Sequence, residues 1–461
     1  MFNRQVAPAN AVAAPLRKCA ASTLCGLRTF ALAAYLGSVC AVAVAAEPLP
    51  AAAPMNASLE QLTLREAETL FAARNREVQI GQRLVEGAQA DRLTAGQRPN
   101  PNVSINTSKF NSRQGNYSGD LREKQADSVF GVQQLFERGN KRELRIEAAD
   151  QNVRATRGDY ADIQRQQKLV LYSAYYDLAA AQERLRIAAE TAASFQKTVD
   201  AVERRLTAGD IARTDVARIR VDALRAQNDA RMAEGERRKA QSALAYVIGA
   251  ERDAERISVI DTWPGLGAAA DALEIDKALA GRADVQAAQA RIAGAEKSRE
   301  LARALRTRDV TGSVQFEHFP GDFSNNTFGV GVSIPLFTNY YFEGEIRRAE
   351  VELDAARDNF ERVRALALSE IVRSRADLDS AHDRVRRFGD VLLKEAQRAA
   401  EGAEFAYSRG AIGVMDLLDA RRQLYATRLE AAVAQADYAK SLAAWQAAIA
   451  VAVFAPAGTE K

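Results

Sequence analysis

The sequence predicts a mainly α-helical protein with a small β part, in which a strand pair followed by long coiled-coil helices occurs twice. Three observations predict this fold class. Short patterns recur after about 200 residues. The chain is rich in Ala, Arg, Glu, Leu and Gln and has only 11 prolines, a composition typical of long helices. Apolar residues follow heptad spacing in both halves.

The repeat relates the two halves almost residue by residue. Residues 209–215 recur as 410–416 at an offset of 201, whereas 177–186 recur as 377–386 at an offset of 200. Offsets that differ by one residue over half a chain are typical of a duplicated structural unit.

Composition and turn signals divide the chain into five parts. We expect a signal peptide at 1–46, a first repeat at 47–249, a waist linker at 250–270, a second repeat at 271–453 and a tail at 454–461.

The first part has the features of a secretory signal peptide. Basic residues precede an apolar stretch at 30–45, no acidic residue occurs, and an A-x-A-like cleavage site ends at Ala45. A membrane anchor is the alternative, but the stretch is shorter than the ~20 residues of a spanning helix. All 3 cysteines lie in this part. We therefore expect an exported, cysteine-free and unlipidated protein that begins near Ala46 or Glu47.

Charge and residue counts exclude several functions. Lys plus Arg total 63 and Asp plus Glu total 60, so no basic surplus is available for a nucleic acid. With His318 and His382 as the 2 histidines, neither a zinc site nor a Cys/His dyad is expected. We predict no enzyme activity, no cofactor and no metal centre.

Four segments alternate with the period of a strand, at about 102–108, 128–135, 310–318 and 327–335. One face of each is apolar and the other is small or polar. In a sandwich the apolar face would point inward, but four strands alone cannot form a stable sandwich. In an exported protein the alternative is an outer-membrane barrel with its apolar face toward lipid. Because open sheet edges do not occur in lipid, strands of several copies must then close one ring.

Long helices are predicted after each strand pair. A capping box at Thr63 and Glu66 opens a helix that runs toward Gly96. A helix at 139–206 would be ~100 Å long at 1.5 Å per residue. Two heptad seams repeat at an offset of 200: Ile146, Ala149, Val153, Thr156, Tyr160 and Ile163, then Ile346, Ala349, Leu353, Ala356, Phe360 and Val363.

Tight turns at 208–213 and 409–413 reverse the long helices and give helical hairpins at about 139–248 and 342–450. Gly209 and Gly410 suit the left-handed position that ends a helix.

These features, with three local patterns, resemble the TolC-type outer-membrane efflux channels over nearly the whole mature chain. The patterns are Arg-Pro-Asn-Pro at 98–101, Glu-Arg-Gly-Asn-Lys-Arg at 137–142 and Val-Ser-Ile-Pro-Leu-Phe at 332–337. They are similar to the CzcC-like subgroup, which serves heavy-metal efflux pumps of the resistance-nodulation-division class.

The resemblance implies a homotrimer in the outer membrane. Each chain would give four strands to a 12-stranded transmembrane barrel in outer-membrane lipid and its helices to a periplasmic tunnel. It also implies two partners, an inner-membrane resistance-nodulation-division pump and a periplasmic adaptor protein. The lower tips of the tunnel, where these partners would bind, contain Gly209, Asp210, Ile211, Arg213, Gly410, Ala411 and Ile412.

The best candidates for a gate lie at the second tip. Tyr407 and Gly410 followed by Asp416 and Asp419 resemble the gate segment of the family, and Asp215 is the first-repeat counterpart of Asp416. The spacing of the two later aspartates puts both carboxylates on one helix face. In a symmetric trimer they would form an acidic ring that attracts cations. Stabilisation of the helix start is the alternative role.

One departure from the family lies at the same tip. Ile412 stands where the family can carry an arginine. Arg409 or Arg213 could substitute in a lock that uses this arginine.

The expected function is a passive export duct for divalent heavy-metal cations. Within the family, a duct for drugs or for type I protein secretion is the alternative. The alternative from another class of protein is a periplasmic coiled-coil adaptor or scaffold. An adaptor should show more strand segments, arranged around a single helical hairpin.

Overall fold

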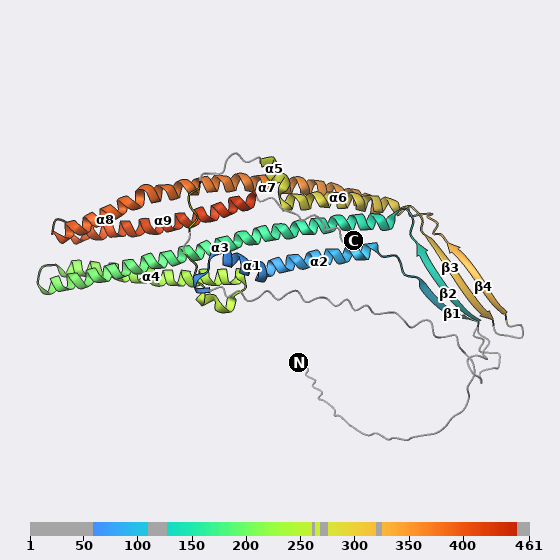
Figure 1. Ribbon diagram of the computed structural model, residues 1–461, viewed down its shortest axis with the longest axis horizontal. Helices are drawn as coiled ribbons and strands as arrows, with labels where there is room; N and C mark the ends of the chain where they lie inside the picture. The colour runs from blue at the N-terminus through green and yellow to red at the C-terminus, as the bar shows by residue number, and fades with distance from the viewer. Residues whose placement is uncertain (1–58, 109–126, 261–262, 268–274, 320–324, 450–461) are drawn as a thin grey trace, which may run out of the picture. The chain divides into compact units, whose positions relative to one another are not determined.

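The computed structural model describes residues 59–108, 127–260, 263–267, 275–319 and 325–449. The predicted signal peptide, the loop at 109–126 and the tail lie outside these residues. The elements that it describes form the mainly helical fold with a small β part that the sequence predicts (Figure 1). The division into repeats and linker stays a prediction.

The strands form one antiparallel sheet in the order β1-β2-β3-β4. They are β1 (Asn102–Ser108), β2 (Asp127–Phe136), β3 (Val310–Phe319) and β4 (Asn325–Ser333). The strand pairs of the two repeats join between β2 and β3. Within the sheet, β1 and β4 each pair on one side, so both outer edges are left for other chains.

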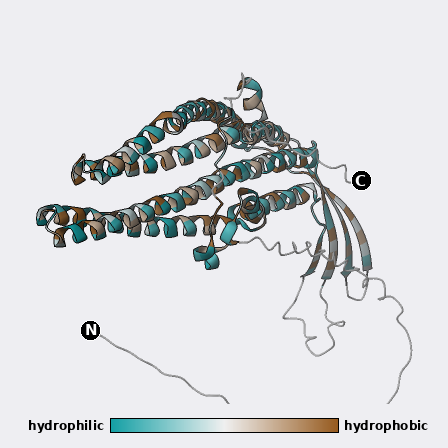
Figure 2. Ribbon diagram, turned by 60° about the vertical axis from the view of Figure 1, so that its left-hand side comes forward, coloured by the Kyte–Doolittle hydropathy of each residue, from teal (hydrophilic) through white to brown (hydrophobic). Residues whose placement is uncertain are grey.

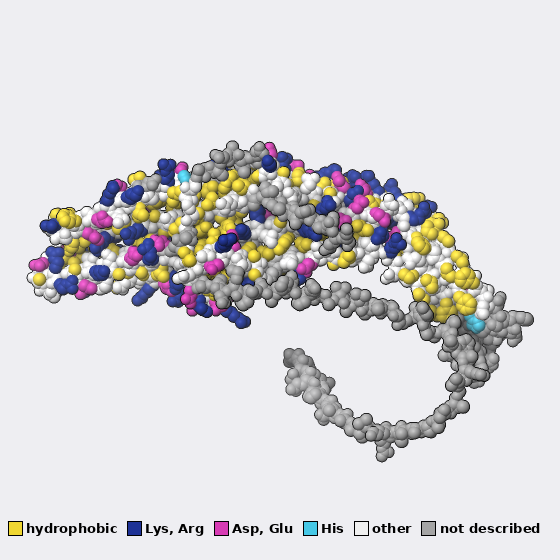
Figure 3. All heavy atoms as spheres, viewed as in Figure 1, with side chains coloured by type: hydrophobic (Ala, Val, Ile, Leu, Met, Phe, Trp, Pro, Cys, Tyr) yellow, Lys and Arg dark blue, Asp and Glu magenta, His cyan; other side chains and the backbone are white. Residues whose placement is uncertain are grey.

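One face of the sheet is apolar. Cross-strand rows join Val103, Val132, Val314 and Val330, and Ile105, Phe130, Phe316 and Phe328. Their side chains are 43–74% exposed, so no described element covers this face. Figure 2 shows the alternation of hydropathy along the strands, and Figure 3 shows hydrophobic side chains gathered on the sheet. The arrangement does not fit the sandwich alternative, which needs this face buried.

The opposite face is polar, and its glycines lie close to polar side chains of the neighbouring strands. Its rows join Asn102, Gln133, Ser313 and Gly331, and Ser104, Gly131, Gln315 and Gly329. A Cβ on Gly331 would lie 2.6 Å from the Ser313 Oγ, and one on Gly131 would lie 2.7 Å from the Ser104 Oγ. Glycines therefore leave room for the polar side chains opposite them.

Long helices follow each strand pair. In the first repeat, α3 (Lys141–Thr207) is continuous over 67 residues and is followed by α4 (Arg213–Ile248). In the second repeat, α7 (Glu343–Arg387), the π-helical η3 (Phe388–Leu392) and α8 (Leu393–Ser408) precede α9 (Val414–Ala448). We call α3–α4 the first hairpin and α8–α9 the second hairpin.

The predicted heptad seams mark faces that pack on shorter helices. Tyr160 and Ile163 contact Gly81, and Ile146 lies beside Gly96, on α2 (Arg76–Gly96). On another face of α3, Gly158 lies against Ala287 of α6 (Ala283–Ala304). A Cβ on Gly158 would come within 2.8 Å of the Ala287 Cβ, so the two helices are in close contact.

The helix predicted from the capping box to Gly96 is wrong in one respect, because it is two helices. The Thr63–Glu66 capping box opens α1 (Leu64–Arg74), which ends at Asn75 before α2 begins. The Asn75 side chain caps α2 by accepting from the Val78 N–H and donates to the Val247 carbonyl at 3.0 Å. The break thus ties the helix pair to the end of α4.

The second repeat has a matching break. α5 (Ile275–Gly281) ends before α6, and Arg282 lies between them. Its guanidinium is 1% exposed and donates to the Ala448 carbonyl at the end of α9. It also pairs with Asp284 at 2.8 Å and with Glu370 at 2.7 Å.

The linker runs along both repeats. After η1 (Leu59–Gln61) and η2 (Glu251–Arg256), Leu62 and Val259 form a parallel bridge. Trp263 stacks on Tyr176 of α3 with ring centroids 6.1 Å apart, and the Tyr438 hydroxyl of α9 donates to the Gly265 carbonyl. The described part of the linker therefore binds the two halves together.

Among the described residues, no helix is both long and apolar enough to cross a membrane.

Candidate functional site

The two tight turns have the same backbone. Gly209 and Gly410 adopt φ of 85° and 73°, the left-handed region expected of a glycine that ends a helix. The Asp210 N–H donates to the Arg205 carbonyl and the Ala411 N–H to the Ala406 carbonyl, both at 2.9 Å. We call residues 205–218 the first tip and residues 406–419 the second tip.

Asp416 caps the start of α9. Its carboxylate accepts a hydrogen bond from the Gly413 N–H at 3.2 Å, and the residue is exposed. Asp215, its counterpart on α4, lies 3.9 Å from Arg218. The helix-start role that the sequence offered as an alternative is therefore present at Asp416, and its carboxylate still faces solvent.

Asp419 belongs to an ion network that joins the two hairpins. Arg422 on α9 pairs with Asp419 at 2.8 Å and also with Asp222 on α4. The Asp222 side chain is 8% exposed, whereas that of Asp419 is 67% exposed. A buried carboxylate needs a charged partner, so Arg422 holds α9 against α4.

Tyr407 makes the second link between the tips. The Arg205 guanidinium of α3 donates to the Tyr407 hydroxyl at 3.0 Å and lies 5.9 Å from the centre of its ring. The repeat counterparts of this pair are Ala406 and Leu206, which cannot form such a contact. The repeat-related copy of this link is therefore absent, and the Arg205–Tyr407 pair joins the hairpins on one side of the repeat.

Packing reinforces these links. Leu418 of α9 is fully buried in the apolar cluster of the first hairpin, which contains Val202, Val216 and Ile219. Arg421 of α9 donates to the Thr198 hydroxyl of α3 at 2.6 Å.

Arg421 also pairs with Glu404 within the second hairpin, and Arg220 pairs with Glu203 at the same positions of the first hairpin. This ion pair is therefore common to both repeats, whereas the Thr198 contact is not.

The arginines that the sequence offered as substitutes lie elsewhere. Arg409 lies over the Phe405 ring, 5.3 Å from its centre, and Arg213 is exposed at the first position of α4. Within the described part of the chain, Arg422 pairs with Asp419 instead.

The residues that sequence reasoning missed are Arg205, Asp222, Leu418, Arg421 and Arg422. The i, i+3 spacing of Asp419 and Arg422 was a usable signal. The contacts with the other hairpin left no signal, because they join residues about 200 apart.

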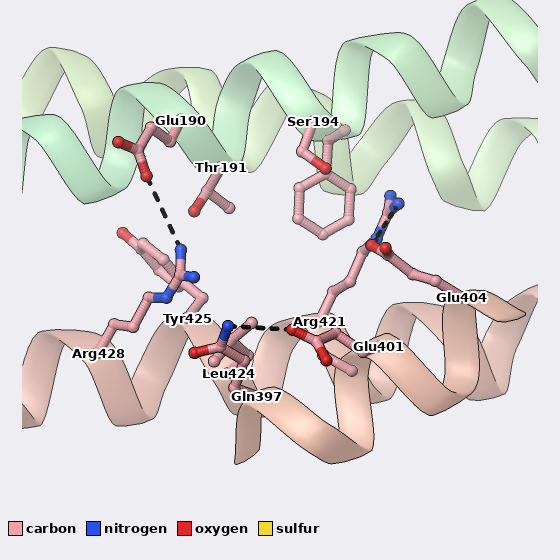
Figure 4. A pocket seen from close by; sticks show the side chains of 12 residues that line it. Glu190, Thr191, Ser194, Gln397, Glu401, Glu404, Arg421, Leu424, Tyr425 and Arg428 are labelled. Atoms are coloured by element: carbon pink, nitrogen blue, oxygen red, sulfur yellow. Dashed lines mark hydrogen bonds and ion pairs between the residues drawn. The ribbon is translucent and has the colours of Figure 1, made fainter. Parts of the chain in front are cut away.

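Between the hairpins lies an open cavity of about 270 Å³ (Figure 4). Glu190, Thr191 and Ser194 line it from α3, while Gln397 and Glu401 line it from α8. Arg428 of α9 reaches across it to Glu190 at 3.8 Å. In the described ranges, no three His, Cys, Asp or Glu side chains are grouped to hold a metal ion.

A sequence model described as outer membrane efflux protein matches residues 58–250 and 275–451, which together make up most of the chain. The chain belongs to the outer membrane efflux protein family.

Known proteins are similar to this chain over most of their length. The cobalt-zinc-cadmium resistance protein CzcC of Cupriavidus metallidurans is 24% identical over 374 residues, which cover 80% of this chain and 85% of CzcC. The solved outer-membrane channel OprN is similar to this chain with a TM-score of 0.70 at 21% identity. The superposed part covers 84% of this chain and 89% of the OprN chain. CusC, solved in work on transmembrane channel formation, has a TM-score of 0.70 at 19% identity and covers 84% and 92%.

Membership of the family fixes several properties. The protein is a passive outer-membrane efflux channel that extends into the periplasm, and it is not an enzyme. The resemblance to the TolC-type family is confirmed, and with it the class of fold, a small sheet region continued by long helices. The adaptor or scaffold alternative is wrong, because the matched family is that of the channel itself.

Proposed function

We propose that three copies of the chain form one channel for divalent heavy-metal cations, the outer part of a tripartite resistance-nodulation-division efflux system. The open edges at β1 and β4 support closure with other copies, because unpaired backbone groups are too costly in lipid. The apolar rows then face lipid, and the polar rows with their glycines line the pore.

The metal assignment rests on one relative and on three local sequence patterns. The relative CzcC is a cobalt-zinc-cadmium resistance protein, and it is similar over 80% of this chain. The three local patterns at 98–101, 137–142 and 332–337 also favour this subgroup. The channel has no clustered metal ligands among its described residues, so it conducts the ion and leaves selection to the pump.

The tips act as the gate. Asp416 and Asp419 from three copies surround the narrow end of the tunnel with carboxylates, which concentrate cations there. In the conformation described, Arg422 partly neutralises Asp419 and Arg205 holds Tyr407. Opening requires the second hairpin to leave the first, which breaks the hydrogen bond of Arg205 to Tyr407 and the ion pair of Arg422 with Asp222. Asp215 contributes further negative charge from the first tip.

The outer surfaces of both tips bind the periplasmic adaptor and the pump. Asp210, Ala411 and Arg213 are exposed there, and Ile211 and Ile412 are partly exposed. Docking at Gly209 and Gly410 would act directly on the turns that join the helices.

A deletion strain tests the cargo. Loss of the gene should sensitise the cells to cobalt, zinc or cadmium, and a plasmid copy should restore growth. Unchanged growth on these metals and on nickel and copper would contradict the metal assignment. If sensitivity to drugs or loss of a secreted protein appeared instead, the cargo would be that of the alternative ducts.

A further inference from the structure

The two strand pairs join their long helices through connections of different chemistry. β2 leads into α3 through residues 137–140, the first connection, and β4 leads into α7 through residues 334–342, the second connection. Both end on a residue in the left-handed region, Asn140 with φ of 56° and Phe342 with φ of 61°. Asparagine adopts this conformation readily, whereas a bulky side chain there is rare. The phenylalanine must therefore be held by its surroundings.

At the first connection, the charges are paired within the protein. Lys141 pairs with Asp309 at 2.8 Å, and the lysine side chain is 7% exposed. Glu137 pairs with Arg145, and both side chains are mostly buried. This connection is therefore fixed by ion pairs that the protein supplies itself.

The second connection is aromatic instead. The Phe342 ring packs against the rings of Phe337 and Tyr340, with centroids 5.3 Å and 4.9 Å apart. These contacts hold Phe342 in its unfavourable backbone conformation. The neighbouring apolar side chains point outward, because Leu336 is 75% exposed, Tyr340 54% and Tyr341 45%.

This exposed surface continues the apolar face of the sheet. Ile334 follows Val330 and Val332 with the same alternation and is 46% exposed. In the proposed barrel the apolar rows face lipid, and the helices extend into the periplasm. The second connection therefore lies at the periplasmic boundary of the membrane, at the level of the lipid headgroups. Tyrosine side chains are enriched at this level in membrane proteins.

Two exposed arginines lie on the second connection. The Arg308 guanidinium is 5.4 Å from the centre of the Phe337 ring, and Arg306 donates to the Tyr341 carbonyl at 3.2 Å. A neutral ring and a carbonyl leave both positive charges uncompensated. Glu345, at the start of α7, accepts from a tyrosine hydroxyl of the same connection. Figure 3 shows basic side chains where the helices meet the hydrophobic surface of the sheet.

Arginines farther along the helices are neutralised by carboxylates. Arg303 of α6 pairs with Glu350 at 3.0 Å, and Arg348 of α7 pairs with Glu352 at 2.7 Å. Among the described residues, the two arginines of the second connection have no such ion pair. Their charge is available to an anion at the headgroup level.

We propose that Arg306 and Arg308, together with Tyr340 and Tyr341, bind the phosphate group of a phospholipid in the inner leaflet of the outer membrane. Guanidinium groups bind phosphate through paired, charge-assisted hydrogen bonds. Leu336 lies on the same surface and contacts the upper part of the acyl chains. Each chain binds one lipid in this way, at its second repeat only. The site goes beyond the proposed function, because it concerns neither the cargo nor the tips.

Native mass spectrometry of the detergent-solubilised protein tests the site. Phosphatidylglycerol and a diacylglycerol with the same acyl chains are titrated separately, so that the two probes differ in the phosphate headgroup. The parent should bind one phosphatidylglycerol per chain and prefer it to the diacylglycerol. Arg306→Gln with Arg308→Gln should weaken phosphatidylglycerol binding about tenfold or more and leave diacylglycerol binding unchanged.

A matched double variant separates the site from the overall charge. Arg348→Gln with Arg357→Gln removes the same charge from exposed, paired positions of α7 and should bind phosphatidylglycerol as the parent does. Equal weakening in this control would overturn the proposal, and so would equal affinity of the parent for both lipids. Displacement of the lipid by an excess of inorganic phosphate would show a site for a free anion and would overturn it as well.

Hydrogen exchange on the unaltered protein covers the case in which the arginine variant does not assemble. Added phosphatidylglycerol should slow amide exchange at 334–342 and leave 137–141 unchanged. Equal slowing of both connections, or none at 334–342, would overturn the site. Both measurements follow lipid binding without transport, so they fail or succeed separately from the assignment of the cargo.

Discussion

Single-residue differences between the repeats create the contacts of the tips. The backbone is the same at Gly209 and Gly410, yet Tyr407 replaces a leucine and Asp419 replaces an arginine of the first repeat. These differences allow the second hairpin to bind the first through side chains that the first hairpin lacks. Under the proposed gate, a duplicated tube acquires its closing contacts in this way without a new element.

Removing the Tyr407 hydroxyl should favour the open channel. Tyr407→Phe and Arg205→Ala each remove one hydrogen bond that contributes about 0.5–1.5 kcal/mol in each copy. Both variants should raise the mean open time in planar bilayers, and the double variant should add little. Tyr246→Phe, at an exposed site far along α4 from the tip, is the control. Additive effects of the pair would show that the two residues act separately.

The carboxylates of the second tip should set ion selectivity. Asp416→Ala with Asp419→Ala should lower the cation preference of the pore, measured as the reversal potential in a salt gradient. Loss of the cap at Gly413 should cost about 1 kcal/mol of stability as well. Asp383→Ala with Glu395→Ala removes the same charge from exposed sites outside the tip. An unchanged reversal potential in the tip variant would remove both aspartates from the gate.

Sequence reasoning reached the tip residues that follow local rules. The turn glycines and the helix start at Asp416 are readable because turns and caps depend on neighbours in the chain, whereas Tyr407 came from the resemblance to the family's gate segment. Arg422 with Asp222 and Arg205 with Tyr407 depend on how two hairpins dock. No local pattern encodes that arrangement.

At the scale of elements, each repeat is anchored where its short helix pair breaks. Asn75 binds the end of α4 with a neutral amide, and Arg282 binds the end of α9 within a buried ion network. Arg165 extends this network from α3 to Glu370 at 2.8 Å. The network therefore ties the second repeat to the long helix of the first.

This network should make the protein sensitive to acid. Burial alone raises the pKa values of Asp284 and Glu370, but hydrogen bonds from Arg282 and Arg165 outweigh it and hold both below their ordinary values of 3.8 and 4.5. The unfolded state then binds protons first as the pH falls. The contribution of these groups to the stability of the fold is therefore complete at neutral pH. It is lost as the pH falls through the pKa values that the groups have in the folded state.

Melting temperature measured against pH tests this prediction. Glu370→Gln should lower the melting temperature at neutral pH and flatten its decline below about pH 4.5. Asp354→Asn, at an exposed site of α7, should leave both unchanged. If the melting temperatures of Glu370→Gln and of the parent fell in parallel as the pH is lowered, the network would not titrate in this range.

The elements themselves were largely predictable. Capping, heptads and strand alternation placed the long helices and the four strands, because each signal is local and repeated. The break at Asn75 was missed, because a single residue between two helical patterns gives no periodic signal. The π turn appeared in the sequence only as a change of offset from 200 to 201.

At the scale of the whole molecule, the two faces of the sheet decide how copies assemble. The apolar rows are exposed in a single chain, and the edges of β1 and β4 have no further partner in the sheet. Both features are unfavourable in water. When copies close a ring in lipid, the strand edges pair with one another and the apolar side chains contact lipid.

Charge placed on the two faces should therefore have opposite outcomes. Val314→Arg puts a charge on the apolar face and should cost about 2–4 kcal/mol near the bilayer centre. Ser313→Arg, at the preceding residue, puts the same charge on the polar face. Heat-resistant trimers in the membrane fraction should be lost in Val314→Arg and kept in Ser313→Arg. Equal loss in both variants would mean that lipid does not contact the apolar rows.

Membrane fractionation, combined with the native mass of the detergent-solubilised protein, tests the central claim most directly. A trimeric channel predicts recovery in the outer-membrane fraction at three times the mass of the mature chain. Recovery as a monomer in the soluble periplasmic fraction would contradict it.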